Sequence, residues 1–230
     1  MNELIKQLDE TINREWAVIK AGRFWTQVMS EPVPGELYRL MMEQIYHYTR
    51  YNSVNQAAAA LRTSPERRRL LKFVYKHAAE ELGHEAMVLH DLKSIDLLDN
   101  ASLQDGPLPP TAALIAYLTQ VAMEKGAVAR LGYSYWAESC YDHIDTLLKK
   151  FRSDLQLVDA NMTFFVAHSE IDAGHSAEVL EAMRAAEPTE QEKADIVNVA
   201  RTTLYLTGQI LERVALEHAE RQQGDLKLAA

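Results

Sequence analysis

The most constraining feature of the chain is a pattern of histidine and acidic residues, H-x3-(E/D)-x2-H, that occurs twice. The later copy comprises His168, Asp172 and His175, within the segment A-H-S-E-I-D-A-G-H-S. If this segment is helical, the three side chains fall within about 60° of one another on one face. Two imidazoles and a carboxylate offer lone pairs to a borderline or hard cation, so the triplet predicts half of a metal site. Taken alone, it is also typical of surface hydrogen bonds.

The earlier copy makes the metal interpretation stronger. His77, Glu81 and His84 repeat the same spacing, and in both copies a glycine (Gly83 or Gly174) directly precedes the last histidine. Two antiparallel helices can bring such half-sites together in the core of a bundle, as bundle proteins with two metal ions do. A recurrence of this kind is hard to explain as a solvated surface.

Other acidic and imidazole groups are candidate ligands. Glu138, in G-Y-S-Y-W-A-E-S-C, is either a ligand or an exposed residue at a helix end, and Glu124 competes with it on the same predicted helix. Glu43 and His47 share a helix face with Arg50. They are either additional ligands, residues that hydrogen-bond to ligands, or part of a salt-bridged edge.

Two residues near this face are candidates for substrate binding. Arg50 could bind a substrate carboxylate through two parallel hydrogen bonds, although such an arginine more often pairs with its helix neighbours. Tyr46 belongs to a group of tyrosines that suits either core packing or a pocket that orients a substrate.

Length and composition narrow the class of protein. The 230 residues suffice for one substantial domain, which we expect over 1–222, with a disordered tail over 223–230. A net charge of −9 argues against nucleic acid, and no apolar run is long enough to span a membrane. A charged start and a single cysteine, Cys140, argue against a signal peptide and an internal disulfide and favour the cytoplasm.

Nearly all of the chain has the apolar spacing of helices, with proline and glycine where helices should end. Ser64 and Pro65 predict a helix start, Ser153 and Asp154 predict a cap for the helix with the later triplet, and 94–110 reads as an irregular crossover. The sequence therefore predicts an all-α protein of about seven helices. The expected helices cover 2–29, 34–61, 65–93, 111–139 with a break or kink near Gly126 or Gly132, 142–151, 155–187 and 189–221.

The order of the candidate ligands resembles a known family, the heme-oxygenase-like di-iron oxidases and oxygenases. The resemblance is nearest to the branch of the chlamydial protein associating with death domains and the coenzyme PQQ synthesis protein C, in the TENA-like superfamily. The intact H-x3-D-x2-H signature is its most specific part. The residues that carry the resemblance are Glu81, His84, Glu138, His168, Asp172 and His175.

This resemblance implies a seven-helix, single-domain heme-oxygenase-like bundle that holds two iron ions per chain on those six ligands, with Asp172 or Glu138 as the bridge. His77 would be an additional ligand, a residue beside the ligands, or a packing residue. The implied activity is an oxidation with O2 of a small amino-acid-, amine- or carboxylate-like substrate, in biosynthesis, with an electron donor where turnover needs one. The resemblance also suggests a homodimer.

Three alternatives remain at this point. A ferritin-like di-iron protein also uses Glu and (E/D)-x-x-H, but normally lacks a histidine at the position of His168. A metal-free relative of the same fold would be a cofactorless oxidase or a thiaminase-type hydrolase, although Cys140 does not lie in the pattern expected for the hydrolase nucleophile. A helical interaction protein with structural zinc would bind metal without oxygen chemistry.

Overall fold

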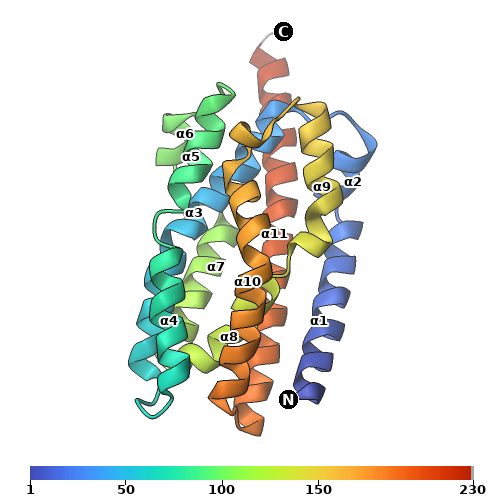
Figure 1. Ribbon diagram of the computed structural model, residues 1–230. Coiled ribbons are helices and arrows are strands. Elements are labelled where there is room, and N and C mark those ends of the chain that lie inside the picture. Colours follow the sequence, from blue (N-terminus) through green and yellow to red (C-terminus); the bar gives the residue numbers. More distant parts are fainter. Residues whose placement is uncertain (229–230) are drawn as a thin grey trace.

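The computed structural model describes residues 1–228, except for the side chains of 170–174 and 225–228. Within these residues the protein is built from helices, with no strand, and the long helices run side by side in one bundle (Figure 1). The all-α prediction is confirmed. The elements are α1 (Asn2–Ala21), α2 (Arg23–Ser30), α3 (Gly35–Ala59), η1 (Ala60–Arg62), α4 (Arg68–Glu80), α5 (Glu85–Ser94), α6 (Asn100–Gln104), α7 (Pro109–Gln120), η2 (Val121–Lys125), α8 (Gly126–Ala137), α9 (Tyr141–Asp154), η3 (Asp159–Asn161), α10 (Thr163–Ala186) and α11 (Glu190–Leu228).

The longest helix, α11, packs against α8, α1, α7, α3 and α2 and so joins both halves of the chain. Its apolar residues recur at helical spacing and are buried, among them Ile196, Leu204 and Val214. Buried apolar residues from Leu4 to Ala215 form one continuous core. The helix also continues to Leu228, beyond the end near 221 that the sequence predicts.

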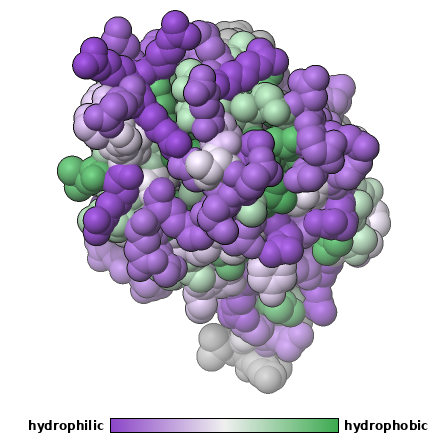
Figure 2. Space-filling view, turned by 90° about the horizontal axis from the view of Figure 1, so that it is seen from below, coloured by the Kyte–Doolittle hydropathy of each residue, from purple (hydrophilic) through white to green (hydrophobic). Residues whose placement is uncertain are grey.

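The lower end of the bundle has a mostly polar surface (Figure 2). Figure 2, the view from below, shows hydrophilic side chains over most of this end of the bundle, with hydrophobic ones scattered among them. Among the described residues, no helix combines the length and the apolar character that a membrane span requires.

The first predicted helix is in fact two helices. Gly22 has extended backbone angles, φ −74° and ψ 166°, which end α1 and begin α2. A side chain at this position would collide with the carboxylate of Glu212. The same carboxylate accepts a hydrogen bond from the amide of Phe24 at 3.4 Å, so a contact across the bundle fixes the break.

The helix that carries the earlier triplet also differs from the prediction. It begins at Arg68 and has no side-chain cap, while the hydroxyl of Ser64 bonds to the carboxylate and the backbone amide of Glu66 in the turn before it. It ends at Glu80, and α5 begins at Glu85. Between them Gly83 has a φ of +96°, a conformation that glycine adopts without steric cost. Glu81 and His84 therefore lie in a turn between two helices, not on one helix face.

The remaining differences concern helix ends and one break. The predicted break near Gly126 is confirmed: the π turn η2 precedes it and its φ is +78°, whereas α8 runs through Gly132. Ser153 and Asp154 belong to the end of α9 and do not cap α10. The crossover 94–110 contains the short helix α6.

The close approach of α8 to α11 gives a stability test. A Cβ at Gly132 would collide with the backbone carbonyl oxygen of Ile196. We expect Gly132→Ala to lower the free energy of unfolding by about 1–3 kcal/mol, since the two helices must move apart. Gly224 in α11 is the matched control, because nothing lies within 4 Å of its added Cβ. Gly224→Ala should be neutral or stabilising by up to about 1 kcal/mol. Equal denaturation midpoints for both variants would contradict this packing.

Candidate metal centre

The candidate ligands come from three places in the bundle and meet in its interior. His77 is on α4, while Glu81 and His84 are in the turn after it. Glu138 follows the last residue of α8, and His168 and His175 are on α10. Their side chains are buried or half-buried.

The first donor group consists of Glu81, His84 and His168. One nitrogen or oxygen atom from each lies within 4.8 Å of the others. His84 Nδ1 is 3.1 Å from His168 Nε2 and 3.5 Å from Glu81 Oε1. His168 Nδ1 donates to the carbonyl oxygen of Phe164 at 2.6 Å, so Nε2 of the neutral ring carries the lone pair. That lone pair is on the nitrogen nearest His84, as metal binding requires.

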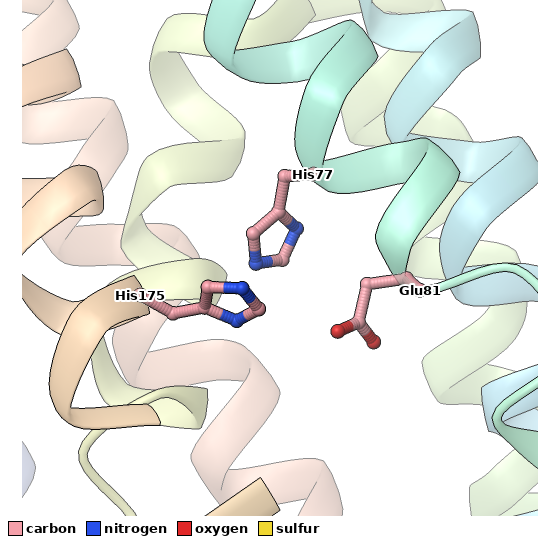
Figure 3. A group of neighbouring side chains, drawn as sticks. All are labelled: His77, Glu81 and His175. Carbon is pink, nitrogen blue, oxygen red and sulfur yellow. The ribbon is translucent and has the colours of Figure 1, made fainter. Parts of the chain in front are cut away.

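The second donor group consists of His77, Glu138 and His175. His77 Nε2 is 3.1 Å from Glu138 Oε1, and His175 Nδ1 is 3.3 Å from Glu138 Oε2. Glu81 again lies close: ligand atoms of His77, Glu81 and His175 are within 4.8 Å of one another, and Figure 3 shows these three side chains converging. Glu81 is therefore common to both donor groups.

Hydrogen bonding within the second group leaves a place for a cation. Gln56 Oε1 accepts from Arg130 Nη1 at 3.2 Å, which identifies it as the oxygen, and it lies 3.0 Å from His77 Nδ1. His77 Nδ1 therefore donates, and Nε2 of the neutral ring turns a lone pair toward the carboxylate of Glu138. Two acceptors at this distance need a proton or a metal ion between them. Nδ1 of His175 is also buried, without a hydrogen-bond partner among the described residues.

Arg130, on α8, fixes the orientation of this centre through a network of hydrogen bonds. It is 3% exposed, and its guanidinium donates to Asn55 Oδ1 at 2.8 Å and to Asn52 Oδ1 at 2.6 Å. Asn52 Nδ2 in turn donates to Glu81 Oε2 at 3.0 Å. Burial lowers the pKa of Arg130 to about 10. Sequence reasoning missed these residues, although the spacing of Asn52, Asn55 and Gln56, at i, i+3 and i+4 on one helix face, was a usable signal.

Charge interactions keep the carboxylates ionised. Burial alone would raise the pKa of Glu138, but the neighbouring rings of His175 and His77 hold it at about 2. The hydrogen bond to Glu81 raises the pKa of His84, against the effect of burial. The centre is therefore a pair of buried carboxylates that attract positive charge.

The start of α10 is fixed by a buried carboxylate from α5. Asp91, fully buried, accepts hydrogen bonds from Thr163 N at 2.9 Å, Thr163 Oγ1 at 2.6 Å and Phe164 N at 2.9 Å. It satisfies backbone donors that the first turn of a helix leaves unpaired. Because His168 lies one turn further along, this cap also sets the position of the first donor group.

Several predicted site residues have other partners. Glu43 forms an ion pair with Arg39 at 2.5 Å and accepts from Ser102 at 2.8 Å. The ring of His47 packs edge-on against Tyr46 at 5.4 Å between centroids, and the guanidinium of Arg50 lies over the ring of Tyr46. These last three residues line a separate groove beside α6.

Two candidates remain, Glu124 and Asp172. Glu124, the competitor of Glu138, is exposed and bonds to Gln120. Asp172 belongs to α10, but its side chain lies outside the described residues. Of the six predicted ligands, the structure brings five together and adds His77 to them.

Comparisons with known proteins bear on the family and the fold of the chain. The model of a family described as iron-containing redox enzymes matches residues 39–208. A domain of unknown function with a heme oxygenase-like fold from Shewanella denitrificans is 37% identical, with a TM-score of 0.91 over 96% of this chain and 95% of that one. No curated protein matches the chain.

More distant solved structures share the fold alone. A TenA homologue from Pseudomonas syringae is 15% identical, with a TM-score of 0.75 over 92% of each chain. A CADD-like protein of unknown function from Nostoc punctiforme is 16% identical, with a TM-score of 0.74 over 94% of this chain and 97% of that one. The predicted heme-oxygenase-like fold is thus confirmed.

The Asp91 cap gives a test of how α10 is positioned. In Asp91→Asn an amide NH2 replaces one of the two accepting oxygens and meets the backbone donors of α10. We expect the free energy of unfolding to fall by about 1–3 kcal/mol, the cost of leaving a buried donor unsatisfied. Asp99 caps α6 in the same way but is half-exposed. Asp99→Asn should therefore change the free energy of unfolding by less than about 0.5 kcal/mol. Equal losses in chemical denaturation would show that burial of the cap is unimportant.

Proposed function

Since this chain belongs to the family of iron-containing redox enzymes with a heme-oxygenase-like fold, we propose that it is a non-heme di-iron oxidase or oxygenase. It would use O2 to oxidise a small organic substrate. The observation that carries the proposal is the position of Glu81, which belongs to both donor groups. A carboxylate shared in this way can bind one metal ion through each oxygen.

The donor set suits iron. Imidazole and carboxylate ligands together favour Fe(II) over the metals that prefer thiolates or oxygen alone. Glu81, His84 and His168 would hold one ion. His77, Glu138 and His175 would hold the other, with Asp172 as a further proposed ligand. The geometry supports Glu81 as a bridge, while the bridge by Asp172 or Glu138 that the resemblance implied stays a prediction.

Iron bound here supplies redox chemistry with O2, and the chain's own residues prepare the site for it. The carbonyl of Phe164 and the amide of Gln56 each hold the Nδ1 proton of a histidine ligand, which leaves Nε2 ready to bind. Asn52 holds one oxygen of Glu81. A cavity with a largely apolar lining adjoins these groups.

A metal-free hydrolase is the second candidate, because Cys140 lines the same cavity and a thiol could serve as nucleophile. That enzyme would have no need for two converging donor groups beside its cavity. The two candidates differ directly in iron content, and the following experiment separates them.

Histidine variants test the two donor groups one at a time. We expect the metal-free protein to bind two Fe(II) per chain without oxygen, and to consume O2 when it is then admitted. His168→Ala and His175→Ala should each reduce tightly bound iron to about one per chain with nearly unchanged helix content, because each removes a ligand from a different ion. His90→Ala is the control, since His90 is exposed and outside both groups; it should still bind two. Two irons in both ligand variants, or none in the wild type, would refute the proposal.

A further inference from the structure

A cavity of about 170 Å³ adjoins the donor groups. Glu81, Glu138 and His168 line it where the metal ions would lie. Residues of α1, α2 and α9, among them Trp16, Trp25 and Leu148, line it as well. Figure 1 shows these three helices on the opposite side of α10 from α4 and α5. The cavity thus extends from the donor groups across the bundle.

The lining restricts the charge of whatever enters. No lysine or arginine is among the described residues that line the cavity, and its carboxylates, Glu81 and Glu138, both belong to the donor groups. A charged group on the body of a substrate would have no partner here, and burying an unpaired charge is costly. Arg50, expected to bind a substrate carboxylate, lines the other groove instead.

The volume and the lining of the cavity restrict the size and shape of a bound molecule. A cavity of about 150 Å³ with apolar walls is known to accept benzene, so this one has room for about one ring or a chain of equal volume. All three tryptophans of the protein, Trp16, Trp25 and Trp136, are in the lining. Aromatic walls favour offset or edge-to-face contact with an aromatic ring.

We propose that the substrate is an apolar molecule of about one aromatic ring, with an uncharged body and a single polar or anionic group that meets the donor groups at Glu81, Glu138 and His168. This inference rests on the proposed function, because the reacting end is placed by the metal site. It narrows the substrate class, because molecules with a charged group remote from the reacting end are excluded by the lining.

Tryptophan fluorescence tests the substrate class in the metal-free full-length protein. The probes are two benzyl alcohols of similar size that carry an ethyl or a carboxylate group at the para position. We expect saturable fluorescence change with the ethyl compound, and at least about 30-fold weaker binding of the carboxylate compound, since its charge finds no lysine or arginine in the lining and would meet the ionised Glu81 and Glu138 at the donor groups. Equal or tighter binding of the carboxylate compound, or no saturable change with the ethyl compound, would overturn the inference.

A charge introduced into the lining provides the converse test. Leu148 is half-buried on α9, so Leu148→Arg places a cation at the cavity without emptying the core. The variant should bind the carboxylate probe at least about tenfold more tightly than the wild type does, because the charge then has a partner. Val18→Arg, at an exposed position of α1 outside the lining, is the matched control and should change nothing. The wild-type comparison decides the matter if Leu148→Arg does not fold.

These measurements are independent of iron. Selective binding of the neutral probe by a protein that binds no iron would refute the di-iron proposal and leave the apolar cavity as a ligand site. Two bound iron ions together with unselective probe binding would refute only the inference about substrate class.

Discussion

The buried guanidinium of Arg130 is the interaction on which the orientation of the centre depends. A charge in the bundle interior is tolerated only when its donors are paired, and Arg130 pairs with three polar side chains of α3. Two of these, Asn52 and Gln56, then bond to Glu81 and His77. The packing of α8 against α3 therefore fixes the position of one member of each donor group.

The break between α4 and α5 is the second requirement. An uninterrupted helix would place Glu81 and His84 on one face, so both side chains would point in the same direction. The turn at Gly83 instead lets Glu81 lie between the two donor groups, while His84 meets His168. The cap of α10 by Asp91 comes from α5 as well, so the element after the break positions the helix that supplies His168 and His175.

Much of the fold and of the centre could be predicted from the sequence. The helical spacing and the two histidine triplets predicted an all-α bundle, and the resemblance predicted its heme-oxygenase-like fold. The residues that the structure brings together include five of the predicted ligands. The break after α4 was missed because apolar spacing continues across Gly83. Asp91 and Arg130 were missed because their partners are distant in sequence, and a single buried charge has no periodic signal.

The central claim is that Glu81 lies between two iron ions, and anomalous diffraction tests it most directly. Crystals of the protein loaded with Fe(II) without oxygen would be measured at the iron absorption edge. The account predicts two peaks about 3.5–4 Å apart, the separation typical of two-metal sites. One should lie beside His84 and His168, the other beside His77, Glu138 and His175, with the carboxylate of Glu81 between them. A single peak, or peaks that Glu81 does not join, would contradict it.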